Sequence, residues 1–274
     1  LAYDQGGMAA VYLVQDTQQP ATVRAVKELN ELGSFDWPDR AANLIAFNRE
    51  AALLRTLSHP NLPRVYDSFS EAGRHYLVMD YIEGETLADV LEKLSSPLPE
   101  ATVLTWALQL CDVLAYLHAR TRPIIFRDVK PDNIMVTPRG EVKLIDFGIV
   151  RYFKVGQNQD TLIVGTPGYA PPEQHGEGQT DARSDVFSLC AVLHELATGH
   201  NPPDQLAPFP PAHRLNPALS RELSSVLERG LQLERPRRWN SMAELRAALA
   251  QVQQAGPTAA PRRSLWGRLK GNGG

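Results

Sequence analysis

Four polar side chains between residues 128 and 146 carry the chemical groups that phosphoryl transfer requires. Asp128 and Lys130 stand two residues apart, and on an extended segment their side chains point to the same side. A proton acceptor would therefore lie beside a positive charge. Asn133 and Asp146 add hard oxygen ligands, which suit Mg²⁺ bound to substrate phosphates. Because positioning and electrostatic stabilisation supply most of the rate of this reaction, these four residues are candidate catalytic groups.

Three short apolar runs are expected to position these groups. Ile124–Phe126, Ile134–Val136 and Val142–Ile145 are rich in β-branched residues, and a turn at Pro138–Gly140 precedes the third run. Runs of this kind, bounded by turn residues, predict short strands with polar side chains at their ends. The alternative interpretation is an apolar meander with polar turns.

The motifs around these residues resemble those of the protein kinases. The sequence FRDVKPDN, at residues 126–133, stands where that family has H-R-D-x-K-x-x-N, and residues 146–148 match its D-F-G motif. With both motifs in order and closely spaced, the chain from Leu1 to Val252 resembles the eukaryotic-like (Hanks-type) bacterial serine/threonine protein kinases. The resemblance implies an α+β fold of two lobes with ATP between them. A small antiparallel sheet with one helix would span residues 1–79, a hinge 79–82, and a larger, mainly helical lobe 83–252.

The start of the chain resembles the glycine-rich loop that covers ATP phosphates in this family. The stretch Asp4–Tyr12 stands where the family has G-x-G-x-x-G-x-V, and Gly6 is the glycine that matches. Asp4 and Ala9 replace the outer two glycines. Most of the strand before this loop is expected to be missing, so the first strand would be incomplete. The simpler alternative is a glycine-rich hairpin turn.

The resemblance also implies the other contacts to ATP. Lys27 would bind the α- and β-phosphates and pair with Glu50, which lies on a helix predicted from Ala41 to Leu57. Without the surrounding motifs, the simpler interpretation is that Lys27 is an ordinary lysine at the end of a strand and Glu50 a solvated glutamate on a helix. Met79 would gate the back pocket, and the backbone of the hinge would bind adenine. The residues expected to bind ATP are Gly6, Gly7, Val11, Ala25, Lys27, Glu50, Met79, Asp80 and Ile82.

By the same resemblance, each of the four central residues has a role in catalysis. Asp128 would orient the substrate hydroxyl and accept its proton, and Lys130 would offset charge that grows on the γ-phosphoryl group. Asn133 and Asp146 would hold Mg²⁺ or Mn²⁺.

The stretch from Ile149 to Glu173 resembles the activation segment of the family. Thr161 stands where a phosphorylatable residue is expected, and its phosphate would dock on Arg127, with help from Arg151. The alternative for Thr161 is a solvated loop hydroxyl. Thr166 matches the threonine that bridges the catalytic aspartate and lysine, which favours serine and threonine as acceptors.

Two further matches have structural roles in the family. Glu173 is expected to pair with Arg238, and Asp185 to hold the backbone of the catalytic loop. Apolar spacing predicts the helices that would carry these residues. They are expected at Thr86–Leu94 and Ser241–Val252, which have capping boxes from Thr86 with Asp89 and from Ser241 with Glu244, and at Glu100–His118, Ser184–Thr198 and Ser220–Leu231. Six prolines between residues 202 and 217 argue against a regular helix there.

Composition bounds the remaining possibilities. The 274 residues are 43% hydrophobic and carry a formal net charge of −3, which gives no reason to expect nucleic-acid binding. Cys111 and Cys190 fall on apolar helix faces and are expected in the core.

The absence of a transmembrane run or a signal peptide predicts a cytoplasmic protein, and a start at Leu1 predicts a fragment. Residues 253–274 are basic and rich in small residues, which predicts a flexible tail or linker, with a weak membrane-surface or partner anchor as the alternative.

These observations predict an enzyme that uses ATP and Mg²⁺ or Mn²⁺ to phosphorylate serine and threonine hydroxyls on proteins. A homodimer would allow autophosphorylation in trans. The first alternative is a pseudokinase scaffold, favoured by Asp4, Ala9 and the replacement of the usual histidine by Phe126, which would pack under Phe147. The second is a small-molecule kinase, against which the peptide-binding motif GTPGYAPPE at residues 165–173 argues.

Overall fold

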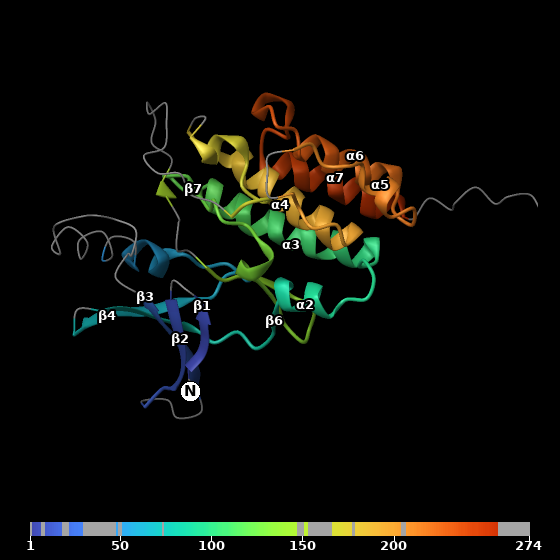
Figure 1. The fold of residues 1–274 in the computed structure, drawn as a ribbon. Helices are drawn as coiled ribbons and strands as arrows, with labels where there is room; N and C mark the ends of the chain where they lie inside the picture. Colours follow the sequence, from blue (N-terminus) through green and yellow to red (C-terminus); the bar gives the residue numbers. More distant parts are fainter. Residues whose placement is uncertain are drawn as a thin grey trace, which may run out of the picture.

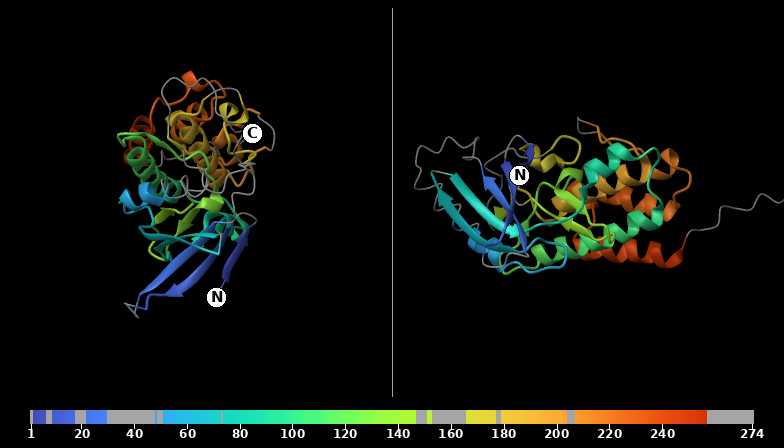
Figure 2. Two further views of the ribbon diagram at one scale, coloured as in Figure 1. Left: turned by 90° about the vertical axis from the view of Figure 1, so that its left-hand side faces the viewer. Right: turned by 90° about the horizontal axis from the view of Figure 1, so that it is seen from below.

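The structure is a computed structural model. It describes residues 2–6, 9–17, 22–29, 48, 51–72, 74–146, 151–152, 166–176, 179–203 and 207–256. Figure 1 shows two parts, a twisted sheet made by the start of the chain and a larger group of helices made by the rest. The views in Figure 2 place the sheet at one end of the molecule and the helices at the other. We call these parts the small lobe and the large lobe.

The small lobe is a five-stranded antiparallel sheet with strand order β1-β2-β3-β5-β4. A helical segment at residues 51–56 accompanies it, and Ala51 and Leu54 on this segment are buried. The strands are β1 (Ala2–Gly6), β2 (Ala9–Gln15), β3 (Val23–Leu29), β4 (Val65–Glu71) and β5 (Arg74–Asp80).

The first strand extends further than the sequence predicted. Strand pairing between β1 and β2 continues as far as Gly6 opposite Ala9. Asp4 and Gly6 therefore lie within β1, although both were expected in a loop after a largely missing strand. Residues 7 and 8, between the two strands, lie outside the described part.

The large lobe is built on two long helices, α3 (Glu100–His118) and α4 (Ala182–Thr198), which lie side by side at its centre (Figure 1). Most of α4 is buried, and Cys111 and Cys190 are fully buried free thiols, as the sequence predicted. No helix in the described ranges has the length and apolar character needed to cross a membrane. The other helices are α2 (Leu87–Lys93), α5 (Ala212–Leu215), α6 (Arg221–Gly230) and α7 (Met242–Ala255).

Short strands lie where the two lobes meet. Those predicted at residues 124–126, 134–136 and 142–145 form as β7 (Ile124–Ile125), β8 (Ile134–Val136) and β9 (Val142–Leu144). β8 lies between β9 and β6 (Glu85–Thr86), and β7 pairs with β10 (Arg151–Tyr152). Three single 3₁₀ turns complete the described elements: η1 (Pro131–Asn133), η2 (Pro172–His175) and η3 (Arg235–Arg237).

Helix caps explain where the helices begin. Thr86 and Asp89 form the predicted capping box of α2, each side chain bonding the other residue's backbone N–H. The second predicted capping box forms only by half. Ser241 accepts from the N–H of Glu244, but the Glu244 carboxylate accepts from the N–H of Asn240, one residue earlier. The carboxylate therefore holds the residue before the cap.

Candidate active site

One face of the small-lobe sheet gathers most of the predicted ATP-binding side chains. Val11 is opposite Lys27 in the β2–β3 register, and Ala25 is opposite Met79 in the β3–β5 register. Residues directly opposite in antiparallel strands share a face, and residues two apart in a strand share it too. Val11, Ala25, Lys27 and Met79 therefore lie on the same face.

Lys27 reaches from this face to the large lobe. Its Nζ lies 2.5 Å from Oδ1 of Asp146, and the lysine side chain is 12% exposed. The aspartate of the D-F-G motif is thus the carboxylate partner of Lys27 in the described part of the chain. Glu50, the partner predicted from the sequence, lies outside the described residues, as does Gly7, so both assignments stay predictions.

Asp128, Lys130 and Thr166 form a polar triangle in the large lobe. The Thr166 hydroxyl donates to Oδ1 of Asp128 at 3.0 Å and accepts from Nζ of Lys130 at 3.1 Å. Lys130 Nζ lies 3.6 Å from Oδ2 of Asp128, to which the Asn133 amide donates at 2.8 Å. The structure therefore brings together a carboxylate, an ammonium and a hydroxyl from two segments almost forty residues apart.

A buried carboxylate holds the backbone before Asp128. Asp185 is 0% exposed, and its carboxylate accepts from the N–H groups of Phe126 and Arg127 at 2.9 and 2.8 Å. His118 on α3 gives the same carboxylate a third contact, with Nε2 at 2.7 Å. Arg127 adopts a φ of 69°, a left-handed conformation that a non-glycine residue adopts only when its surroundings enforce it. The contacts from Asp185 therefore shape the turn that presents Asp128.

One departure from the family pattern falls next to this turn. Phe126, in place of histidine, is 1% exposed and belongs to the hydrophobic core. Its predicted neighbour Phe147 lies outside the described residues. Sequence reasoning gave His118 a structural role without naming its partner, because only the fold brings α3 and α4 together at this point.

Asn133 and Asp146 fit a divalent cation. The Ile145 N–H donates to the Asn133 carbonyl at 2.9 Å, which places Asp146 next to Asn133. The Asn133 amide nitrogen donates to Asp128, and no donor in the described ranges contacts its oxygen. The described residues contain no cluster of three His, Cys, Asp or Glu side chains suited to a metal ion. Two protein oxygens suffice for Mg²⁺, which takes its other ligands from water and substrate phosphates.

The segment after Thr166 packs tightly against the large lobe. Gly168 has a φ of 85°, and a Cβ there would lie 2.8 Å from Cβ of Pro202, so glycine is required. The Tyr169 hydroxyl donates to Oε2 of Glu195 at 2.5 Å, and burial raises the pKa of both side chains. Thr161, the predicted phosphorylation site, lies outside the described residues.

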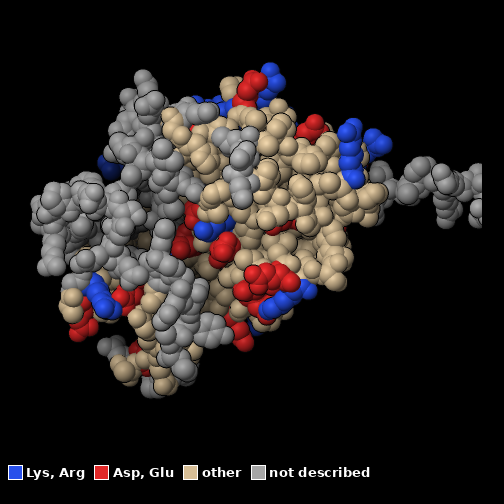
Figure 3. Space-filling view, viewed as in Figure 1, with Lys and Arg blue, Asp and Glu red and all other residues tan. Residues whose placement is uncertain are grey.

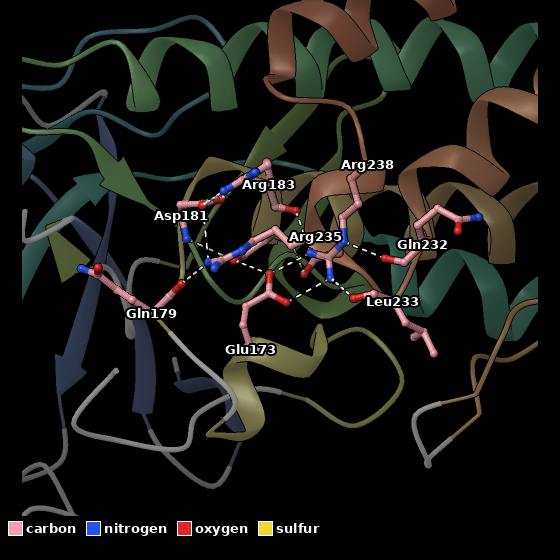
Figure 4. Close-up of polar contacts among 10 residues, drawn as sticks. Glu173, Gln179, Asp181, Arg183, Gln232, Leu233, Arg235 and Arg238 are labelled. Atoms are coloured by element: carbon pink, nitrogen blue, oxygen red, sulfur yellow. Dashed lines mark hydrogen bonds and ion pairs between the residues drawn. The ribbon is translucent and has the colours of Figure 1, made fainter. Parts of the chain in front are cut away.

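Glu173 and Arg238 form a buried ion pair with two parallel hydrogen bonds (Figure 4). Arg238 Nη1 and Nη2 donate to the two Glu173 oxygens at 2.7 and 3.0 Å, and Arg238 is 0% exposed. The rest of the guanidinium donates to the carbonyls of Arg183, Gln232 and Leu233. Because all its donors are used, the charge is compensated inside the lobe, as buried charges must be.

The surface view supports a polar cleft between the lobes. Figure 3 shows acidic and basic side chains next to one another in the recess between the two lobes. A lysine from a sheet facing a cluster of oxygen ligands, a carboxylate and a second lysine is an arrangement suited to binding and transferring phosphoryl groups. The fold and the site together define the protein kinase class.

Comparisons with known proteins agree with this class. Residues 4–245 match the family model described as "Protein kinase domain". The chain is 34% identical to the serine/threonine-protein kinase PknB of Mycobacterium leprae, over 94% of this chain and 43% of the relative. It is 33% identical to the serine/threonine-protein kinase Pkn1 of Myxococcus xanthus, over 89% of this chain and 36% of the relative. The chain thus spans less than half the length of these curated relatives.

Solved structures give the same result. The kinase domain of Mycobacterium tuberculosis PknI aligns with a TM-score of 0.73 and 26% identity, covering 91% of this chain and 93% of that one. A structure titled "PpkA-294 apo form" aligns with a TM-score of 0.73 and 27% identity, over 91% and 94% of the two chains. The chain belongs to the protein kinase family, in its bacterial Hanks-type serine/threonine branch. The predicted α+β two-lobed fold is confirmed, and membership of this family implies the use of ATP and a divalent cation.

Proposed function

We propose that this chain transfers the γ-phosphoryl group of ATP to serine and threonine hydroxyls of proteins. The observation that carries the proposal is the triangle of Asp128, Lys130 and Thr166 beside Asn133, with Lys27 contacting Asp146 across the cleft. A proton acceptor, two ammonium groups and two oxygen ligands thus converge on one region. These are the groups that phosphoryl transfer needs.

Each residue has a definite task in the proposed reaction. Asp128 accepts a hydrogen bond from the substrate hydroxyl, orients it towards the γ-phosphorus, and takes its proton as the new P–O bond forms. Lys130 offsets the negative charge on the transferred group, and Lys27 holds the α- and β-phosphates. Mg²⁺ or Mn²⁺, bound by Asn133 and Asp146, would neutralise charge on the phosphate oxygens. ADP leaves with the bridging oxygen, so atoms and charge balance.

The intact site favours an active kinase over a pseudokinase scaffold. Asp4 lies on β1, and Phe126 fills a core position; neither change removes a group that binds phosphate, metal or the transferred proton. Lys27, Asp128 and Asn133 are all present, and the contacts of Lys27 with Asp146 and of Asn133 with Asp128 support the roles proposed for them.

The proposal is tested by following ³²P transfer from ATP to a serine- or threonine-containing protein and to the chain itself. Asp128→Asn should lower kcat at least about a hundredfold, because the proton acceptor is lost while the shape is kept. If the Asp128→Asn protein transfers phosphate as fast as the native protein does, the transfer comes from a contaminant. If the native chain shows no transfer, the scaffold alternative is favoured.

We further propose that the chain regulates itself by phosphorylating Thr161 in trans, within a homodimer. The support is the position of Thr161 ahead of residues 165–169 in the family pattern, together with Arg127 beside the catalytic aspartate. Mass spectrometry of the native chain and of the Asp128→Asn variant tests whether Thr161 is phosphorylated. Phosphate on Thr161 should occur in the native chain and not in Asp128→Asn; its absence from active native protein would contradict the proposal.

A further inference from the structure

The strand that leads into the hinge ends at Asp80, whose carboxylate lies at the centre of a polar cluster. Asp80 is directly opposite Arg24 in the β3–β5 register, so their side chains share the face of the sheet opposite to Lys27. Arg24 Nη1 and the Tyr66 hydroxyl donate to Asp80 Oδ1 at 3.2 and 2.7 Å. Oδ2 accepts from the N–H of Arg64 at 3.0 Å. We call Arg24, Arg64, Tyr66 and Asp80 the hinge cluster.

A β-bulge brings Tyr66 into this cluster. Val65 is opposite Met79 and Asp67 is opposite Val78, which leaves Tyr66 as an extra residue on β4. Bulges of this kind redirect a side chain and often lie next to active sites. The ring of Tyr66 also lies under the Arg24 guanidinium, with 3.6 Å between Cζ and the ring centroid. Burial and the hydrogen bond to Asp80 raise the pKa of Tyr66, so its hydroxyl remains a donor at neutral pH.

Arg64 and Asp80 are also joined through their backbones. The Asp80 N–H donates to the Arg64 carbonyl at 3.0 Å, while the Arg64 N–H donates to the Asp80 carboxylate. Because the N–H of residue 80 is used, its remaining backbone group for a base is the carbonyl oxygen. A carbonyl oxygen only accepts hydrogen bonds, so it requires a donor on the base. Adenine has such a donor in its exocyclic amino group.

We propose that the Asp80 side chain is a positioning group that fixes the backbone of residue 80 against the amino group of adenine. The inference rests on the proposed function, in which the hinge backbone binds the base. Hydrogen bonds to an ionised acceptor are stronger than neutral ones, and here three donors, one on β3, one on β4 and one on the residue before β4, fix one carboxylate. The Asp80 carbonyl is thereby held at one position, and the site favours ATP over purine nucleotides without that amino group.

The test compares two nucleotides and four proteins. Calorimetry with Mg²⁺ would give dissociation constants for ATP and for purine riboside triphosphate, in which hydrogen replaces the amino group. Asp80→Asn should weaken ATP binding about tenfold and Tyr66→Phe about threefold, while binding of the analogue changes less than about twofold. Tyr116→Phe is the matched control. It also removes one tyrosine hydroxyl, which lies on α3 and accepts from the N–H of Ser58 at 2.9 Å, and this variant should bind both nucleotides like the native chain.

The outcomes separate this inference from the proposed function. Equal weakening for both nucleotides, or none, would overturn the inference, because a merely structural role does not depend on the amino group. Thermal unfolding verifies that each variant is folded, and Tyr66→Phe, which loses one hydroxyl only, keeps the test valid if Asp80→Asn is unstable. A native chain that binds neither nucleotide would contradict the proposed function and the inference with it.

Discussion

At the scale of single residues, Thr166 is the point where two segments of the site meet. Its hydroxyl donates to Asp128 and accepts from Lys130, so one oxygen fixes both the proton acceptor and the nearby positive charge. The direct distance of 3.6 Å between Lys130 and Asp128 is too long for a hydrogen bond. Thr166 therefore sets the geometry that the two charged residues present to a substrate hydroxyl.

Replacing this hydroxyl should impair the chemical step more than nucleotide binding. Thr166→Val keeps the size of the side chain and removes both hydrogen bonds, so we expect kcat to fall by roughly ten- to a hundredfold with little change in KM for ATP. Thr166→Ser retains the hydroxyl and should keep most of the native rate. Steady-state kinetics with both variants tests this expectation. Equal rates for the valine and serine variants would show that the bridge has no role in catalysis.

Site residues that belong to short motifs could be predicted from the sequence. Contacts that depend on which residues face each other in paired strands could not. Asp128, Lys130 and Thr166 belong to short patterns with fixed spacing, and the structure brings them together. The sequence assigned the contacts at the hinge to the backbone, and no role was predicted for the Asp80 carboxylate. Its partners lie on β3, on β4 and on the residue before β4, and Tyr66 reaches it through a bulge that leaves no mark in the sequence.

At the scale of elements, the sequence predicted the long helices and three of the short strands, but it did not predict two strands of two residues each. α3 begins and ends at the predicted residues, because Pro99 fixes its start and its apolar positions repeat over five turns. β6 and β10 were not predicted, because each has only two residues and is too short to show periodicity; β6 pairs with β8 and β10 pairs with β7. These strands exist because tertiary contacts bring their backbones together.

The proline-rich stretch after α4 shows how a segment without regular structure is held in place. Proline removes backbone donors, and among the residues of this stretch that the structure describes only the four of α5, starting after Pro211, are helical. The carbonyl of Pro210 instead accepts from Nε2 of His194 on α4 at 2.8 Å, and Phe209 packs edge-on against the same ring. Nδ1 of His194 is buried and has no partner among the described residues.

This buried histidine should make stability fall in mild acid. Burial lowers the pKa of His194, partly offset by its bond to Pro210, so the folded chain takes up a proton at lower pH than the unfolded chain does. The free energy of unfolding therefore decreases as the pH falls below about 6.5, which is the ordinary pKa of histidine. His194→Gln keeps a donor for Pro210 and has no titrating group. Urea unfolding at about pH 7.5 and about pH 5 should show the stability of the native chain falling more steeply than that of the variant. Parallel curves would refute this explanation.

At the scale of the whole molecule, Asn61 ties the small lobe to the large one. It follows the helical segment of the small lobe and is 8% exposed. Its amide donates to the Val142 carbonyl at 2.7 Å and to Oε1 of Gln109 on α3 at 3.0 Å. The backbone carbonyl of Asn61 accepts from the N–H of Leu144 at 2.9 Å. Because β9 ends at Leu144, two residues before Asp146, this anchor sets where the carboxylate proposed to bind the metal lies relative to the sheet that carries Lys27.

Removing the anchor should loosen nucleotide binding without touching any group in the cleft. Asn61→Ala leaves the buried Val142 carbonyl without this donor and removes one of the two donors to the half-buried Gln109 amide oxygen, so the free energy of unfolding should fall by about 1–3 kcal/mol. If the anchor also aligns Lys27 with Asp146, KM for ATP should rise several-fold while KM for the protein substrate changes little. Asn216→Ala is the matched control, because it removes a bond of the same kind, to the Ala197 carbonyl at 2.8 Å, entirely within the large lobe. That variant should lose stability and keep the native KM for ATP. If Asn61→Ala also loses stability but keeps the native KM for ATP, other contacts set the relative placement of the lobes. A loss of stability alone does not move the two halves of the site apart.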